Sequence, residues 1–480
     1  MNQVERRLDW NRLLISVRQR PGSGASVADS RNAFEKDYHR IVGSASFRRL
    51  QDKTQVFPLD QSDFIRTRLT HSLEVSSLAR SLSQTVAQEI YFRGLDPSLT
   101  RELTHEMGDL LLCAGLIHDI GNPPFGHYGE TSIRDWFKIN LPLLSYRGKA
   151  LDEVLHPQMM QDLLNFEGNA QAIRLLSKLH FLKDDFGMNL TLPLLNTIIK
   201  YPVSSLEMKP NHADVRYKKF GYFYTETELY REICSHTGTN GCRHPLTFLL
   251  EAADDIAYRT ADIEDAYIKG RFTYGQLMEA LMDTPRLAAM SHDERADYRY
   301  RCDVLGQKRA EAKDKKANKP DLYAIQNWIV FVQASLIQEA TRSFCDHYDA
   351  IMNGEWASDL FQGTTAEHLI GVLGDIAVEF VFTSKQIISL EIAANSIIKG
   401  LLDKFLPAAI HWKTEQPRTS LEPRMMAMIS DNYRSSYFSQ SEGKSEIEQL
   451  YLRILLVTDY ICGMTDNFAK SLYRKFYGVE

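Results

Sequence analysis

The sequence predicts an all-α fold, and three observations carry this prediction. Apolar residues recur at spacings of three and four in long segments, the pattern of helices that bury one face. The alternation that strands need is scarce. The composition is that of an ordinary globular protein, with 44% hydrophobic and 25% charged residues, which argues against a disordered or fibrous chain.

Six segments have the helical period: 69–91, 104–119, 245–268, 322–353, 384–403 and 445–470. The aromatic alternation from Lys218 to Tyr224 is the best strand candidate, so we expect at most a short β-hairpin beside the helices. A length of 480 residues suits two or three average domains or one elaborated helical domain.

A basic stretch from Gln307 to Pro320 marks a boundary near residue 320. It carries six Lys or Arg residues and then a proline that should end any helix. We interpret it as a solvated helix end and loop, with contact to nucleic acid or a neighbouring subunit as the alternative.

Charge and targeting signals narrow the classes of protein. The formal net charge is −6, so any phosphate binding must come from a local basic patch. The N-terminus lacks the apolar core of a signal peptide and no apolar run is long enough to span a membrane, so we expect a cytoplasmic protein without a membrane partner. The six cysteines form no C-x-x-C pair, which suggests neither a disulfide framework nor a thiolate zinc site.

The most informative segment joins an apolar helix, 110–117, to the pair His118-Asp119 and to the breakers that follow at 121, 123 and 124. Adjacent side chains point about 100° apart on a regular helix, but at a helix end they can reach one ion from two directions. The dipeptide alone is weak evidence, because a His and an Asp adjoin by chance in many chains.

Two further segments supply context. His71 opens a helical apolar pattern, and Asp254 and Asp255 interrupt another. Taken singly, His71 could be a hydrogen-bonded helix histidine and the two aspartates an exposed polar face. Asp254, however, lies among apolar residues, so at least one of the two carboxylates should be buried and therefore paired or metal-bound.

Together with other motifs, these residues resemble the HD-domain phosphohydrolases and, within them, the bacterial deoxyguanosine triphosphate triphosphohydrolases. The resemblance rests on 48–59, 66–75, 118–130, 166–171, 219–221, 251–258 and 459–466, and so covers nearly the whole chain. It implies an HD-domain helical core with helical elaborations. Residues 1–320 would form the catalytic region, with a motif core at about 45–270, and 321–480 a helical C-terminal region that packs on it and completes the site or an oligomer interface.

The resemblance also implies a metal site made of His71, His118, Asp119 and Asp254. Asp254 is preferred to Asp255 because the family has a tyrosine four residues after the ligand and an aspartate eight after it, as at Tyr258 and Asp262. Two nitrogen and two carboxylate ligands make a harder set than a zinc finger, which favours Mn²⁺ or Mg²⁺, with iron as an alternative.

The implied reaction is hydrolysis of dGTP, or of other dNTPs, at the α-phosphorus to a deoxynucleoside and inorganic triphosphate. His127 is the expected proton-transfer residue and Glu130 would orient its ring, although His127 could instead only order its loop. The expected substrate contacts are Arg68, Lys200 and Lys219 on the phosphates and Gln55, Tyr258 and Asp262 on the sugar. Solvent-exposed positions remain the alternative for the two lysines and for Gln55.

Several properties stay open at this stage. Many relatives carry a histidine at the position of Gly168, and distant vertebrate dNTP hydrolases one at that of Asn122, so base preference and proton relay do not transfer. Two alternatives remain, an HD phosphohydrolase for other nucleotides and a nucleic-acid-binding regulator with a degenerate site, although all four ligands are present. The resemblance further implies a homo-oligomer, a tetramer or hexamer, and single-stranded DNA as an effector.

Overall fold

The computed structural model describes residues 7–20, 29–55, 66–180, 184–383, 385–414 and 419–478. Within these ranges the only sheet is an antiparallel pair, β1 (Ser145–Tyr146) and β2 (Lys149–Ala150), and helices make up the remaining regular structure. The predicted all-α class is therefore confirmed.

The first half of the chain contributes α1 (Trp10–Leu13), α2 (Ala33–Gly43), α3 (Ala45–Arg49), α4 (Arg68–Arg93), α5 (Arg101–Ile117), α6 (His127–Asn140), α7 (Leu151–Val154), α8 (Pro157–Leu164), α9 (Gly168–Arg174), α10 (Leu192–Ile198), α11 (Thr227–Thr237) and α12 (Pro245–Ile268). The second half contributes α13 (Tyr274–Met282), α14 (His292–Asp314), α15 (Pro320–Asp346), α16 (Tyr348–Met352), α17 (Glu367–Ala377), α18 (Lys385–Ile410), α19 (Glu422–Met428), α20 (Asp431–Ser441), α21 (Glu446–Cys462) and α22 (Asp466–Tyr477). Short 3-10 or π turns are η1 (Leu50–Asp52), η2 (Leu175–Leu179), η3 (Val215–Tyr217), η4 (Tyr224–Glu226), η5 (Pro285–Ala289) and η6 (Val378–Phe382).

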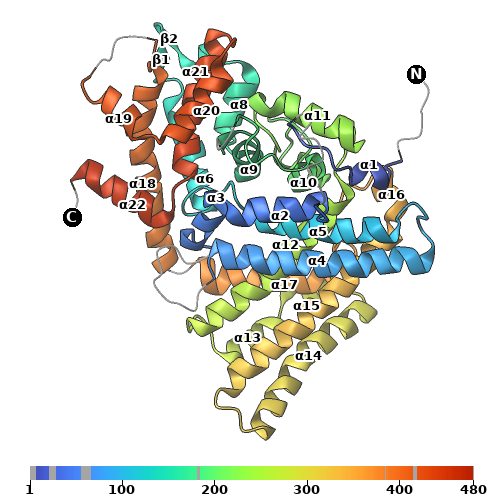
Figure 1. Cartoon of the computed structure of the whole chain (residues 1–480). Coiled ribbons are helices and arrows are strands. Elements are labelled where there is room, and N and C mark those ends of the chain that lie inside the picture. Colours follow the sequence, from blue (N-terminus) through green and yellow to red (C-terminus); the bar gives the residue numbers. More distant parts are fainter. Residues whose placement is uncertain are drawn as a thin grey trace.

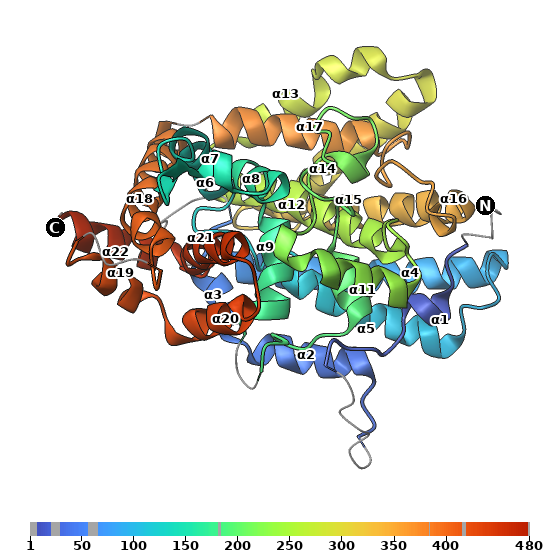
Figure 2. The same ribbon diagram turned by 90° about the horizontal axis from the view of Figure 1, so that it is seen from above.

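Helices α2, α4 and α5 cross the middle of the molecule, with α13, α14 and α15 forming a lobe on one side of them (Figure 1). The C-terminal helices α18 to α22 stand at one end and α1 at the other, an arrangement that the view from above also displays (Figure 2). One continuous hydrophobic core includes residues from both halves of the chain.

Small residues bring α4 and α5 into direct contact. Ser76 donates a hydrogen bond to the carbonyl oxygen of Leu112 at 2.7 Å, and a Cβ at Gly115 would overlap the backbone of Ser76. Thr67 caps α4 and Thr100 caps α5, which fixes where each helix begins. Close helix packing of this kind places the start of α4, with His71, beside the end of α5.

Two of the expected helices are split in the structure. The segment 322–353 divides into α15 and α16 at His347, and 445–470 divides into α21 and α22. In the second case Gly463 approaches the Tyr433 hydroxyl, leaving no room for a Cβ, and Thr465 caps the new helix by accepting from Phe468 N. Apolar periodicity continues across both breaks, which explains why the sequence pattern did not separate them.

The hairpin expected at Lys218–Tyr224 is wrong. This segment is irregular, because its aromatic rings are used for core packing: Phe220 and Phe223 are fully buried and Tyr222 stacks on Tyr230. Gly221 N donates instead to the carbonyl oxygen of Val203, at 3.1 Å.

The boundary near residue 320 coincides with a helix break, although Pro320 begins a helix instead of ending one. Helix α14 ends at Asp314 and Pro320 occupies the first turn of α15, where its missing N–H costs nothing. The division into two regions at this point stays a prediction. Among the described residues, no helix combines the length and apolar character needed to cross a membrane.

Candidate metal centre and substrate cleft

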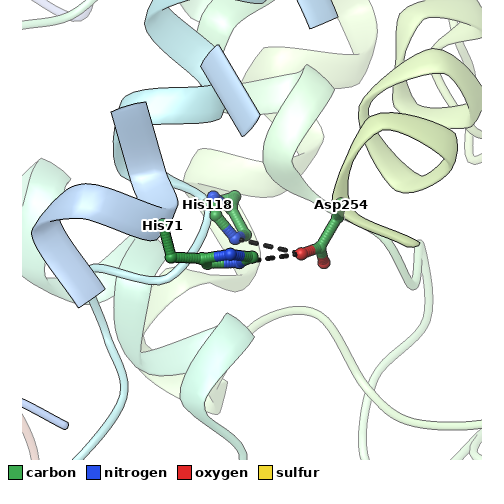
Figure 3. Close-up of side chains that lie close together, drawn as sticks. All are labelled: His71, His118 and Asp254. Atoms are coloured by element: carbon green, nitrogen blue, oxygen red, sulfur yellow. Dashed lines mark hydrogen bonds and ion pairs between the residues drawn. The ribbon is translucent and has the colours of Figure 1, made fainter. Parts of the chain in front are cut away.

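Three side chains carried by, or directly after, three different helices lie close together. His71 lies in the first turn of α4, His118 directly follows α5, and Asp254 lies in α12 (Figure 3). The Nε2 atoms of His71 and His118 lie 3.2 and 3.4 Å from the same oxygen, Oδ1 of Asp254. One potential ligand atom from each residue falls within 4.8 Å of the others, so the three could hold one metal ion.

Asp119 borders this cluster and is held from two sides. Its Oδ2 accepts a hydrogen bond from Arg68 NH1, and its Oδ1 accepts one from Asn122 Nδ2 at 2.7 Å. Oδ1 also lies 3.8 Å from His118 Nε2. The carboxylate is thus oriented toward the cluster without belonging to its tightest part.

The hydrogen bonding of His118 suits a metal ligand. Its Nδ1 lies 2.8 Å from the carbonyl oxygen of Gly115, which can only accept, so Nδ1 carries the proton. Nε2 faces Oδ1 of Asp254 at 3.4 Å, and the carboxylates of Asp119 and Asp254 raise the pKa of His118 against the effect of burial. This position between Nε2 and the carboxylate suits a positive charge, either a proton on Nε2 or a divalent metal in its place, so these residues fit a metal.

The positive charges around the cluster lower the pKa of both of its aspartates. Burial alone would raise the pKa of Asp254, but Lys200, His118 and His71 together hold it well below its usual range. Burial would likewise raise the pKa of Asp119, yet Arg68 and His118 hold it low. Both carboxylates are therefore ionised at neutral pH, and each can act as a negatively charged metal ligand.

A cleft of about 410 Å³ opens above the cluster. Its lining consists of Thr54, Gln55, Arg68, Asp119, Phe125, Gly126, His127, Tyr128, Thr131, Asp254, Asp255, Tyr258 and Phe382. Of the residues expected from the sequence, Gln55, Arg68, Asp119, His127, Asp254 and Tyr258 line it. Tyr258 lies one turn after Asp254 on α12, so both side chains reach the same space.

The loop between α5 and α6 delivers His127 to the rim of the cleft. Gly126 has a φ of 59° and a Cβ there would overlap the Arg68 guanidinium, so this position requires glycine. His127 Nδ1 donates to Oε2 of the buried Glu130 at 3.0 Å, and Gly168 N donates to Oε1 at 2.8 Å. The bond to Glu130 raises the pKa of His127 despite its partial burial.

Six expected site residues do not line the cleft: His71 and His118 of the cluster, and Glu130, Lys200, Lys219 and Asp262. Lys200 is buried with its Nζ 2.9 Å from Asp254 Oδ2, and Lys219 pairs with Glu167 at 2.9 Å. Glu130 lies beneath His127. Asp262 is buried behind Tyr258, with which it shares a hydrogen bond, and burial raises its pKa to about 8.

The sequence analysis missed several residues of the cleft: Thr54, Phe125, Tyr128, Thr131, Asp255 and Phe382. Phe125 and Tyr128 flank the Gly126-His127 pair, so position in the motif could have indicated them. Burial, with a contribution from Asp254, raises the pKa of Asp255 to about 7. No local signal marks Phe382, which comes from the C-terminal region.

The fold and this site define a class of protein, a helical HD-domain protein with a His-His-Asp cluster under a polar cleft. The family model for the HD domain matches residues 68–174, which contain His71, His118 and Asp119. A Listeria monocytogenes protein described as deoxyguanosinetriphosphate triphosphohydrolase-like is 44% identical over 98% of this chain and 100% of its own length. A Klebsiella pneumoniae deoxyguanosinetriphosphate triphosphohydrolase is 32% identical over 99% of this chain and 98% of its own length. A Synechocystis protein described as deoxyguanosinetriphosphate triphosphohydrolase-like is 31% identical over 98% of this chain and 100% of its own length. The chain belongs to the deoxyguanosinetriphosphate triphosphohydrolase family.

Proposed function

We propose that this protein hydrolyses dGTP, and to a degree other dNTPs, to the deoxynucleoside and inorganic triphosphate with a divalent metal. The observation that carries the proposal is the convergence of His71, His118 and Asp254 beneath a cleft that Arg68 and His127 also line. Family membership supports the same reaction.

His71, His118, Asp119 and Asp254 would hold the metal, which we propose to be Mn²⁺ or Mg²⁺, with iron as an alternative. When bound, the metal supplies Lewis-acid activation of the α-phosphate and of water. Arg68 and Asn122 hold Asp119, and Lys200 holds Asp254, so the carboxylates are oriented before any ligand arrives.

Cations beside the cluster would bind the triphosphate, which brings about four negative charges. Arg68 lines the cleft, and Lys200, which does not line it, pairs with Asp254 at 2.9 Å and would bind a phosphate oxygen on leaving this carboxylate. Lys219 faces Glu167 and is a more distant phosphate contact in this proposal.

His127 would act as the proton donor to the leaving 5′ oxygen. Because Nδ1 is bound to Glu130, Nε2 is the nitrogen left to face a substrate, and the raised pKa favours the protonated ring. Water would add to the α-phosphorus and release one proton to solvent, the bond to the 5′ oxygen would break, and the proton from Nε2 would pass to that oxygen, after which the ring would regain a proton from solvent. Glu130 then orients the ring and stabilises its charge.

The sugar would lie against Tyr258, with Gln55 and Asp262 directed to its 3′ side. Tyr258 and Gln55 both line the cleft, and Asp262 bonds the tyrosine. A ring packed at the 2′ carbon leaves no room for a ribose hydroxyl, which would give preference for deoxynucleotides.

The proposal includes a homo-oligomer, a tetramer or hexamer, with single-stranded DNA as an effector. Val378, Ile388 and Ile392 are exposed apolar side chains close in sequence to Phe382 of the cleft, and such a surface favours contact with another copy. Light scattering after gel filtration, with and without a single-stranded oligonucleotide, tests this part.

Product analysis tests the activity. Protein loaded with Mn²⁺ is incubated with each dNTP, and the products are separated by ion-exchange chromatography, with metal-free protein as the control. Free triphosphate from dGTP is expected. Release of orthophosphate or pyrophosphate instead would refute attack at the α-phosphorus.

A further inference from the structure

One buried carboxylate of the C-terminal region contacts both loops that wall the cleft. Asp466, the first residue of α22, is 1% exposed. Its Oδ1 accepts a hydrogen bond from Phe125 N at 2.9 Å. Its Oδ2 accepts from Thr54 N at 3.0 Å and from Thr54 Oγ1 at 2.6 Å. The carboxylate therefore bridges two segments that lie far apart in the sequence.

Each of these segments leads directly to a residue of the proposed chemistry. Thr54 precedes Gln55, and Phe125 precedes Gly126 and His127, and all five line the cleft. Phe125 has a φ of 65°, a conformation that a bulky residue adopts only where its surroundings hold it. The hydrogen bond from Phe125 N to Asp466 is one such restraint.

Lys53 makes a second connection between the same elements. Its buried ammonium donates to the carbonyl oxygens of Asn122, at 2.6 Å, and Cys462, at 2.7 Å. Its own carbonyl oxygen accepts from Arg68 N at 3.0 Å, at the start of α4. The end of α21 and the start of α22 thus hold both walls, and within the described residues Asp466 bonds to Thr54 and Phe125 and not to His71, His118 or Asp254.

We propose that Asp466 is a positioning residue whose own hydrogen bonds set the spacing between the Gln55 loop and the His127 loop, and so affect turnover. This inference rests on the proposed function of the cleft. Misplacement of a reacting group by about 1 Å can cost as much as 10²-fold in rate, so a bridge of this kind has a kinetic effect beyond its effect on stability.

Asp466→Asn tests the proposal with little change of shape. The amide oxygen can still accept from Phe125 N and the amide nitrogen can donate to Thr54 Oγ1, but Thr54 N loses its acceptor. We expect kcat for dGTP to fall about tenfold and the dGTP-to-GTP ratio of kcat/KM to fall as well, with about 10²-fold loss of kcat for Asp466→Ala. Mn²⁺ affinity, measured by titration calorimetry, should stay unchanged.

Leu472→Ala is the matched control, because Leu472 lies on the buried face of the same helix, is 4% exposed and does not line the cleft. Leu472→Ala should lower Tm at least as much as Asp466→Asn does, while kcat and the dGTP-to-GTP ratio of kcat/KM stay at the wild-type values. Amide hydrogen exchange should be faster than in wild type or Leu472→Ala at Thr54 in Asp466→Asn, and at both Thr54 and Phe125 in Asp466→Ala.

Two results would overturn the positioning role. The first is an Asp466→Asn variant with unchanged kcat and an unchanged dGTP-to-GTP ratio of kcat/KM, while wild type is active. The second is an equal loss of kcat in Leu472→Ala, which would mean that Asp466 only stabilises the fold. A wild type that releases triphosphate from no dNTP refutes the proposed function instead, and the exchange measurement still reports whether Asp466 holds the two loops.

Discussion

The replacement His127→Ala separates a proton-transfer role from loop ordering. The His127 side chain is 76% exposed and makes a 3.0 Å hydrogen bond to Glu130. After truncation Glu130 keeps the bond from Gly168 N, so the buried carboxylate is not left unpaired. We therefore expect a change in unfolding free energy of only about 0.5 kcal/mol, the scale of an ordinary surface substitution.

The kinetic loss should be much larger. A lost general acid or base costs roughly 10²–10⁴-fold in rate, so kcat should fall by about 10²-fold or more, which corresponds to about 2.7 kcal/mol in the barrier. The metal cluster is built on α4, α5 and α12, so Mn²⁺ and dGTP should still bind. Triphosphate release at saturating Mn²⁺ gives kcat and KM, and thermal melting gives Tm.

A change of KM with kcat retained would refute the reasoning and assign His127 to loop order alone. Glu130→Gln is the companion variant, because its amide oxygen can still accept from Gly168 N while the charge is removed. The carboxylate raises the pKa of His127, and an acid is active below its pKa, so wild-type activity extends to higher pH. In Glu130→Gln the alkaline limb of the kcat–pH profile should move to lower pH.

Three further predictions concern the metal cluster, the sugar side of the cleft, and the buried carboxylate of Asp162, which lies outside both and accepts hydrogen bonds from Tyr224 N and the Tyr451 hydroxyl. His118→Ala should abolish stoichiometric Mn²⁺ binding and hydrolysis together, because it removes the nitrogen that faces Asp254; calorimetry showing full Mn²⁺ affinity would refute the ligand assignment. Tyr258→Ala should lower the dGTP-to-GTP ratio of kcat/KM by roughly 10- to 200-fold while Tyr258→Phe keeps it, and a ratio equal to wild type in the Ala variant would remove the ring from the sugar site. Burial raises the pKa of Asp162 to about 7, so folding keeps a proton there that the unfolded chain loses above about pH 4. As the pH rises from 4 to 7, the free energy of unfolding of wild type should therefore fall by up to about 4 kcal/mol relative to that of Asp162→Asn. A Tm difference between the two proteins that stays constant from pH 5 to 8 would contradict this.

The helical class and the placement of His118-Asp119 could be predicted from the sequence because both depend on local signals. Apolar periodicity marks α5, and the glycine and prolines after residue 120 end it, so the pair had to lie at a helix terminus. The apolar neighbours of Asp254 likewise indicated a partnered carboxylate, and the structure pairs it with Lys200 and His71, although 26% of its side chain stays exposed. Apolar periodicity did not predict the break between α21 and α22, because the spacing of apolar residues continues through it. Aromatic alternation wrongly predicted a hairpin at Lys218–Tyr224, where the rings pack into the core.

By itself, therefore, the sequence determined the helical class, the end of α5 before the glycine and prolines that follow it, and the residue types available for a metal site. Only the tertiary structure decided that His71 and His118 face one oxygen of Asp254, that Lys200 pairs with this aspartate, and that Asp466 joins the two walls of the cleft. These contacts connect residues separated by 54 to 412 positions along the chain. Local periodicity contains no information about such separations, because they are set by how helices such as α4 and α5 pack against each other.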